Sequence, residues 1–239
     1  MSFIAQALTR FLPLATLALA SYSHADLTAN IGGTSEYVRD GISETRGKPA
    51  WQAGLSFQDT SGLYAGVWSS GVERKEDSAT FEHDVYAGYN LKVIDGVLLD
   101  MSVTRYTWAG DASINDQAYT GGTLRLLLND AFTLGMRQTG NYKGSHFDFR
   151  TLEMAYTWQF SDFSLELYGA QNRWLEVDDE DYNFDQDTLR DSYWHFRVAL
   201  DRSYGPWDFR LAVNRTNLSS EYDAGTTIEF GIQRYFHLW

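Results

Sequence analysis

The chain has 239 residues, 44% of them hydrophobic and 21% charged, a composition that indicates a folded protein rather than a disordered one. It has no cysteine, which excludes disulfide scaffolds and thiolate metal sites, and its net charge of −13 argues against a general affinity for nucleic acid. With 20 glycines, 3 prolines and 15% aromatic residues, it has the composition of a β-type chain.

Residues 1–25 have the features of a secretory signal peptide. Arg10 supplies a positive charge, the stretch Phe11–Ala20 is apolar, and Ser23-His24-Ala25 is a small-x-small cleavage site. We therefore expect residues 1–25 to be removed and residues 26–239 to form a single domain.

Three short sequences near the start of the mature chain carry a family resemblance. They are YVRDGISET (37–45), GKPAWQAG (47–54) and SGLYAGVWSS (61–70), and DVYAGY (84–89) follows them. Together they resemble the TorF-type porin family of Gram-negative bacteria. The resemblance implies an outer-membrane barrel with a pore function, no established substrate and no catalytic residues. Family members usually carry an aromatic-Arg-Gly step where this chain has Arg39-Asp40-Gly41.

The segment 39–49 within this region has two interpretations. Its cations Arg39, Arg46 and Lys48 could belong to a loop that constricts a pore. An ordinary surface loop is the interpretation that general loop statistics favour.

Apolar and polar residues alternate with a period of two along most of the mature chain, which is typical of strands with two different faces. The segment WQAGLSFQ (51–58) is an example. Twelve strands are predicted in this way, at or near residues 27–38, 51–58, 63–72, 81–91, 97–104, 118–128, 132–137, 152–160, 163–168, 194–201, 207–214 and 228–233.

The connections between these strands alternate in length. Short turns are expected at 59–62, 92–96, 129–131, 161–162 and 203–206, and mostly longer polar loops at 39–49, 73–79, 109–117, 143–148, 173–191 and 216–225. This alternation is typical of a transmembrane β-barrel. We therefore predict an all-β fold: a single antiparallel barrel of about 12 strands in the bacterial outer membrane, with both termini periplasmic. A soluble β-protein would show the same period of two.

Aromatic residues gather near the ends of the predicted strands, as in the two interfacial girdles of a membrane barrel. The set is Trp51, Phe57, Tyr64, Trp68, Tyr89, Trp108, Trp158, Phe160, Phe163, Trp194 and Trp207. The chain ends on Trp239, and a terminal aromatic is usual for a last barrel strand. A bulge near Arg234 would bring the hydrophobic residues before it into the usual register.

If the apolar residues face lipid, the alternate residues face the interior. The pore-lining candidates are then Arg125, Arg137, Arg197, Arg210, Glu82, Asp84, Asp100, Glu153, Glu166, Asp201, Asp208 and Glu229, with Tyr86, Tyr168 and His195 beside them. Such charges set ion preference in a pore and orient polar solutes. They could equally fill a closed barrel as ion pairs.

The sequence thus favours a channel for passive diffusion of small polar or charged solutes. The alternative is a closed barrel that acts as a structural or binding module through its outer loops. No Ser/His/acid context, HExxH, GxSxG or phosphate loop occurs, so we expect no enzyme activity, no catalytic residues, no metal and no cofactor.

The expected partners are the lipid bilayer, lipopolysaccharide and a small polar solute, with no nucleic acid. The acidic loop 173–191 includes the run Asp178-Asp179-Glu180-Asp181. It is a weak candidate for divalent cations, and we favour a solvated loop bridged by ions to lipopolysaccharide.

Overall fold

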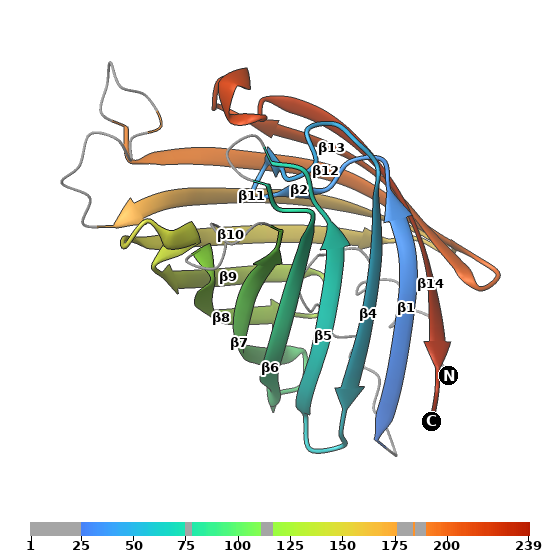
Figure 1. Ribbon diagram of the computed structural model, residues 1–239. Helices are drawn as coiled ribbons and strands as arrows, with labels where there is room; N and C mark the ends of the chain where they lie inside the picture. The colour runs from blue at the N-terminus through green and yellow to red at the C-terminus, as the bar shows by residue number, and fades with distance from the viewer. Residues whose placement is uncertain (1–24, 75–77, 111–116, 176–183, 185–189) are drawn as a thin grey trace.

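A computed structural model describes residues 25–74, 78–110, 117–175, 184 and 190–239 (Figure 1). The barrel strands are, in chain order, β1 (Asp26–Thr34), β4 (Ala50–Gln58), β5 (Leu63–Gly71), β6 (Phe81–Ile94), β7 (Val97–Ala109), β8 (Tyr119–Leu128), β9 (Phe132–Gly140), β10 (Asp148–Gln159), β11 (Phe163–Leu175), β12 (Ser192–Tyr204), β13 (Trp207–Thr216) and β14 (Thr226–His237). Apart from Ala25, the expected signal peptide 1–25 lies outside the described residues.

These twelve strands form one closed antiparallel barrel, as predicted. Each strand pairs with its neighbour in sequence, and β1 closes the ring by pairing with β4 on one side and β14 on the other. Closure leaves no unpaired edge, which is the condition for a sheet to stand in lipid.

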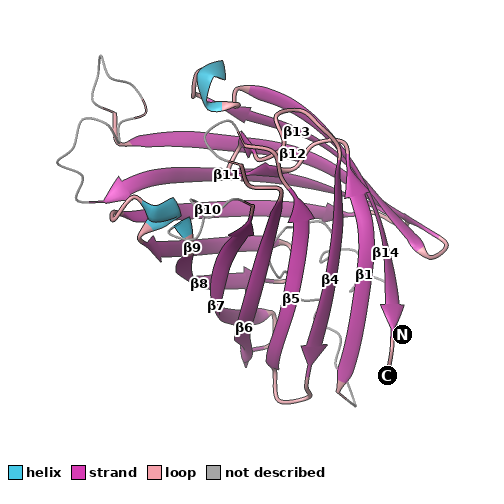
Figure 2. Cartoon of the chain, viewed as in Figure 1, coloured by secondary structure: helices cyan, strands magenta, loops and turns pink. Residues whose placement is uncertain are grey.

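The described part of the chain has little other regular structure (Figure 2). Two short strands, β2 (Val38–Arg39) and β3 (Ile42–Ser43), form a small hairpin between β1 and β4. Two short 3-10 helices are present, η3 (Tyr142–Gly144) and η5 (Ser220–Tyr222). Among the described residues, no helix has the length and hydropathy needed to cross a membrane.

The two ends of the barrel differ. At one end, here called the turn end, short turns join β4–β5, β6–β7, β8–β9, β10–β11 and β12–β13. The longer connections lie at the opposite end, the loop end. Strand β1 begins at the turn end and strand β14 finishes there, where Thr28 pairs with His237. Several strands are longer than predicted, and β6 and β7 run almost to the turn between Ile94 and Val97.

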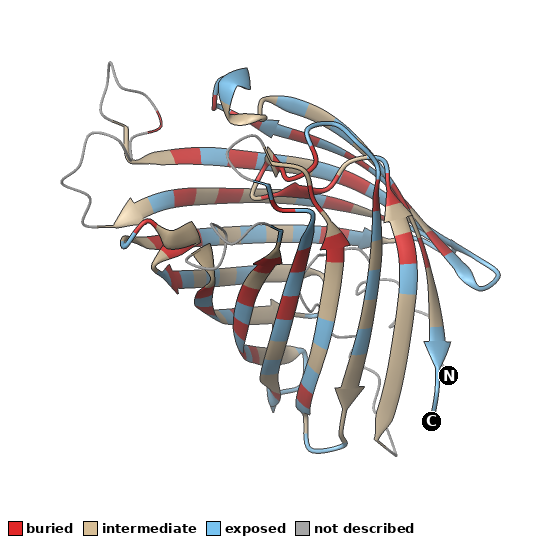
Figure 3. Ribbon diagram, viewed as in Figure 1, coloured by how far each residue is buried: buried red, intermediate tan, exposed pale blue. Residues whose placement is uncertain are grey.

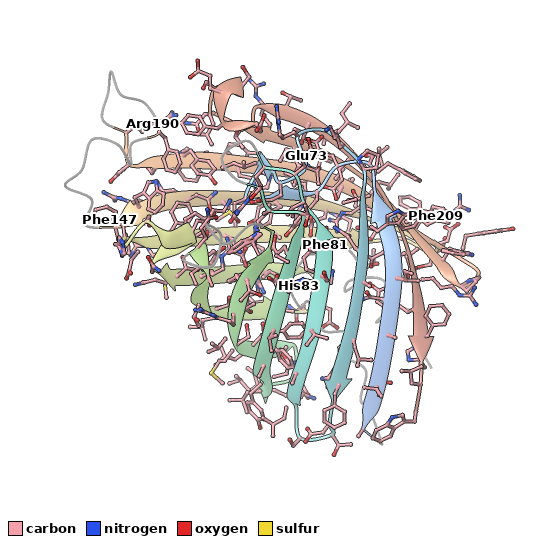
Figure 4. The ribbon with its side chains drawn as sticks, viewed as in Figure 1. Glu73, Phe81, His83, Phe147, Arg190 and Phe209 are labelled. Carbon is pink, nitrogen blue, oxygen red and sulfur yellow. The ribbon has the colours of Figure 1, made fainter. Side chains whose placement is uncertain are left out.

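Burial alternates along the strands, so exposed and buried bands follow one another (Figure 3). On β7, for example, Met101 and Val103 are exposed, whereas Ser102 and Thr104 are buried. Apolar side chains occupy the outer face around the ring, as Phe81 on β6 and Phe209 on β13 illustrate (Figure 4). A barrel with an apolar outer belt and a polar interior is a transmembrane β-barrel.

Three of the aromatic residues that the sequence assigned to the interfacial girdles point into the barrel. Tyr64 and Trp108 are buried and Trp68 is half-buried, all in the inward register of their strands. Tyr64 donates a hydrogen bond to Asp100 Oδ1 at 2.5 Å. All three side chains face the interior, so for these residues the girdle interpretation is wrong.

The expected bulge near Arg234 is also absent from the described strand. β14 pairs with β1 and β13 in an unbroken register through Arg234. Arg234 keeps the outward position, and its guanidinium lies 5.6 Å from the ring centroid of Trp207 and 4.8 Å from that of Phe236. The aromatic rings cover the cation, so the strand need not shift its register to accommodate it.

The outer belt predicts a specific cost for a charge placed in it. Val103 is 56% exposed in the middle of β7. We expect Val103→Arg to lower the free energy of unfolding by about 2–4 kcal/mol in a bilayer, because the guanidinium would face hydrocarbon. Urea titration of the barrel in lipid vesicles measures this. Val103→Met, which keeps the position apolar, should leave the midpoint nearly unchanged.

Candidate functional site

All twelve pore-lining candidates lie in the inward register of the strands. They are buried or half-buried, and they come from β6 to β14: Glu82, Asp84, Asp100, Arg125, Arg137, Glu153, Glu166, Arg197, Asp201, Asp208, Arg210 and Glu229. Tyr86, Tyr168 and His195 face the same interior. The structure thus gathers a dense set of charges inside the ring.

Many of these charges are paired along the wall. Arg125 Nε lies 2.6 Å from Glu153 Oε1. Glu166 Oε1 accepts from both Arg197 at 2.9 Å and Arg210 at 3.0 Å. Each pair joins side chains that are buried away from bulk water, where an unpaired charge would be costly.

The Arg125–Glu153 pair crosses an intervening strand. Arg125 on β8 and Glu153 on β10 both stand opposite Gly135 of β9 in the register. A Cβ at Gly135 would lie only 2.5 Å from Glu153 Oε1. Because Gly135 has no side chain, Glu153 can reach across β9 to Arg125.

Residues 35–49, here called the inner segment, fold into the barrel rather than over its surface. Tyr37, Val38, Arg39 and Glu44 are each less than 9% exposed. The surface-loop interpretation, which the sequence favoured for 39–49, is therefore wrong for the first part of this segment. Its later cations, Arg46 and Lys48, are exposed.

Two consecutive residues hold the inner segment to separate parts of the wall. Arg39 forms a two-pronged ion pair with Glu82 on β6, with Nη2–Oε2 at 2.6 Å. Asp40 accepts from Arg137 Nη2 on β9 at 2.5 and 2.6 Å. Both are charge-assisted contacts with buried partners, the strong class of hydrogen bond.

The wall explains why these two residues fit there. Glu82 has Ser70 and Trp108 as its strand neighbours, so no base lies beside it on the adjoining strands. Arg137 has Thr123 and Thr151, so no acid lies beside it. Arg39 and Asp40 supply the opposite charge that each wall residue lacks.

The tip of the inner segment reaches a third part of the wall. Gly41 adopts φ +82°, in the left-handed region, and a Cβ there would lie 2.3 Å from Thr216 Cγ2 and 2.9 Å from the His195 ring. These residues belong to β13 and β12. These strands lie near β1 in the ring, whereas β9, which Asp40 contacts, lies across the ring from β1. The segment therefore contacts the wall at several points around the interior.

A third ion pair links the segment to the loop end. Lys143 Nζ lies 2.9 Å from Glu44 Oε1, and Arg39 Nη2 lies 3.4 Å from the same oxygen. Burial alone would raise the pKa of Glu44, but Lys143 and Arg39 outweigh burial and lower this pKa to about 2. The stability from this carboxylate is thus fully present above its usual pKa of 4.5 and is lost only as the pH falls toward 2.

An aromatic cluster packs above the segment at the loop end. Arg39 lies 5.5–5.8 Å from the ring centroids of Tyr37, Tyr106 and Trp108. The larger cluster comprises Tyr37, Tyr106, Trp108, Tyr119, Tyr142, Phe149, Phe184 and Tyr193, with smaller residues between them. Desolvated cation–π contacts of this kind strengthen the hold on Arg39.

The wall formed by β1, β4 and β5 is lined by small polar residues. Asn30 on β1, Gly54 and Ser56 on β4, and Gly66 on β5 face inward and are only half-buried. A small cavity of about 20 Å³ lies between this wall and the inner segment, with Tyr37, Gln52, Arg197, Arg210 and Glu229 among its lining residues. That volume accommodates about one water molecule. The free space beside the inner segment is therefore small.

Sequence reasoning missed several residues of this arrangement. Asp40, Glu44, Lys143 and Tyr37 hold the segment but were not among the candidates. The available signal for Asp40 was that Arg39-Asp40-Gly41 departs from the aromatic-Arg-Gly step of the family that the sequence resembles. Lys48 forms an exposed ion pair with Glu73, and the role of Lys48 and Arg46 in a constriction stays a prediction.

Most of the acidic loop 173–191 lies outside the described residues, including the run Asp178-Asp179-Glu180-Asp181. At its ends, Arg173 pairs with Asp191 at 2.7 Å. Within the described part of the chain, no group of three or more His, Cys, Asp or Glu residues could hold a metal ion.

The close approach at Gly135 gives a testable prediction. Gly135→Val would displace Glu153 and leave Arg125 without its partner, so we expect a loss of about 3 kcal/mol in the free energy of unfolding. Urea unfolding followed by tryptophan fluorescence measures it. Gly122→Val is the matched control, because nothing lies within 4 Å of a Cβ at Gly122 on the outer face of β8. Equal losses in both variants would contradict the explanation.

Two solved structures share this fold, and a third aligns with a lower TM-score. The structure titled "KdgM porin" aligns with a TM-score of 0.55 and 13% identity, covering 89% of this chain and 99% of that one. "KdgM porin in complex with disordered oligogalacturonate" aligns with a TM-score of 0.55 and 12% identity over the same shares. OccD3 (OpdP) of Pseudomonas aeruginosa aligns with a TM-score of 0.43 and 12% identity, covering 91% of this chain and 66% of that one.

No curated protein matches the sequence. Residues 18–170 match the model of a family described as "Bacterial protein of unknown function (Gcw_chp)". Since this match spans more than half of the chain, the chain belongs to the Gcw_chp family.

Proposed function

We propose that the chain is an outer-membrane channel for passive diffusion of small polar or charged solutes, narrowed by the inner segment. The single observation that carries the proposal is the way this segment is held. It crosses a charged interior and contacts β6 and β9 through side chains, at Glu82 and Arg137, and Gly41 packs beside His195. Its backbone bonds from Ser43 N–H to Asp223 O and from Glu73 N–H to Glu44 O join it to connections outside the barrel strands. A segment attached in this way can move without breaking the barrel wall.

The two sides of the interior support a passage. One wall carries small polar residues such as Asn30 and Ser56, and the facing wall carries arginines and carboxylates. Opposed charges at a narrow point orient polar solutes and set ion preference. The cavity beside Arg197 and Arg210 is the narrow point where such selection would act.

Two likenesses add support. The barrel shares its fold with a structure titled as a porin, and that porin is also described in complex with an oligogalacturonate. Residues 35–71 resemble the TorF-type porin family. Both favour passage of polar solutes over an enzyme reaction, and they favour the outer membrane as the location, with periplasmic termini.

Recording from planar lipid bilayers tests the proposal. The mature chain should produce discrete conductance steps. The double variant Arg39→Gln/Asp40→Asn should open more often, because losing both contacts destabilises the seated segment by about 3 kcal/mol or more. Lys92→Met, at the exposed pair with Asp95 at the turn end, is the control and should behave like wild type.

The alternative, a closed barrel acting through its outer loops, predicts silence from wild type and double variant alike. Folded insertion is checked by resistance to protease and by the heat-dependent mobility typical of barrels. Silence from inserted protein of both kinds would overturn the channel proposal.

Charge reversal in the interior predicts a change in ion selectivity. Arg125→Glu or Arg197→Glu should shift the reversal potential in a KCl gradient toward that of a cation-selective pore, since each replaces an interior cation by an anion. Arg202→Glu is the control, because Arg202 faces outward and is exposed near the turn end. Unchanged reversal potentials in both interior variants would remove these arginines from the pathway.

A further inference from the structure

Four arginines face outward near the loop end of the barrel, and the proposed channel does not use them. This outer arginine rim comprises Arg105 on β7, Arg150 on β10, Arg173 on β11 and Arg215 on β13. Each shares the outward register of its strand. Arg105, Arg150 and Arg215 lie one position nearer the loop end than the exposed apolar residues Val103, Leu152 and Val213 of that face. The rim therefore lies where the apolar belt ends.

The positive charge of the rim is only partly balanced. Arg105 donates to Thr120 Oγ1 at 3.2 Å and Arg215 to Thr226 Oγ1 at 2.5 Å, and both acceptors are neutral. Arg173 pairs with Asp191. Arg150 forms no ion pair with any carboxylate in the described part of the chain. Asp148 shares the outward face of β10 with Arg150 and accepts from Gln138 Nε2 at 3.2 Å. Among the described residues, the four rim arginines thus outnumber two carboxylates, Asp148 and Asp191.

Two of the rim arginines stand directly opposite each other. Arg150 and Arg173 are register partners on β10 and β11. Side chains at such positions start about 5 Å apart, and like charges there destabilise the sheet. Asp191 offsets the charge of Arg173. An anion that also contacted Arg150 would remove the remaining repulsion, and phosphate is one of the groups whose geometry the arginine side chain matches.

An apolar groove adjoins the rim on the same outer surface. The groove is shallow and open, and it runs over β5 to β9, with Met101, Val103, Gly122, Leu124, Met136 and Gln138 among its lining residues. Val103, Gly122 and Gln138 stand in one register row, so the missing side chain of Gly122 opens the middle of the groove. One row toward the loop end lies Arg105, and Arg150 pairs with Gln138 in the register.

We propose that this surface binds the phosphorylated glycolipid of the outer leaflet, lipopolysaccharide, with its phosphates on Arg105, Arg150 and Arg173 and an acyl chain in the groove. The proposal rests on the outer-membrane location proposed above. A cationic rim directly above an apolar groove matches a ligand with a phosphorylated head and a hydrocarbon tail. Free phosphate would contact only the rim, and a neutral lipid would contact only the groove.

Native mass spectrometry of the mature barrel in neutral detergent tests this binding without requiring a conducting pore. The probes are diphosphoryl lipid A, the same lipid without its phosphates, and inorganic phosphate. Wild type should retain diphosphoryl lipid A. The triple variant Arg105→Gln/Arg150→Gln/Arg173→Gln should bind it about tenfold or more weakly, through loss of charge-assisted hydrogen bonds.

Two further variants separate the two parts of the surface. Gly122→Leu fills the groove and should weaken lipid binding although every rim arginine remains. Arg202→Gln removes an outward arginine at the turn end and should leave the affinity unchanged.

Three outcomes would overturn the proposal: equal binding of the dephosphorylated lipid, displacement of the lipid by inorganic phosphate alone, or equal losses in the triple variant and Arg202→Gln. Because binding is read in detergent, a silent bilayer recording would count against the channel and not against this lipid site.

Discussion

Closure of the sheet is the constraint on which the rest of the structure depends. In lipid, every backbone N–H and C=O group must find its partner within the wall, so the strands join into a ring. A closed ring of pleated strands sends every second side chain inward. Twelve strands then bring a large set of polar groups into the interior, where buried charges are stabilised by pairing with one another. Arg125–Glu153 and the two arginines on Glu166 are the result.

The inner segment follows from what the wall leaves unpaired. Glu82 and Arg137 lie on β6 and β9, and neither has an opposite charge at the flanking register positions. A buried charge without a partner is costly, and a neighbouring pair of residues of opposite sign removes the cost at both places. Arg39 and Asp40 are such a pair, and the aromatic cluster above Arg39 excludes water from it. The inner segment is therefore held mainly by electrostatic contacts, and it need not pair with the strands of the barrel sheet.

The fold could be predicted from sequence because one periodic signal repeats along the chain. A period of two assigns each residue to a face, and it placed Glu153 and Arg197 on the inward side without any structure. It cannot say how deep a residue lies or whether a loop turns inward. Trp108 and Tyr64 looked like interfacial aromatics because they lie near strand ends, yet their register puts them inside. The partners of Arg39 and Asp40 are distant in sequence, at Glu82 and Arg137, so only the closed register brings them together.

The face of the strand on which an arginine lies also decides its surroundings in this barrel. Arg137 on β9 and Arg150 on β10 are 13 positions apart, and the first faces the interior while the second faces outward. Inside, an arginine is surrounded by carboxylates and aromatic rings, which fix its position and satisfy its charge. Outside, at the end of the apolar belt, Arg105 and Arg215 donate to threonine hydroxyls, and Arg173 pairs with Asp191. Slipping a strand by one residue would exchange these two environments and also turn the apolar belt inward. The interior charges and the outer rim are therefore set by the same register, and neither could change without the other.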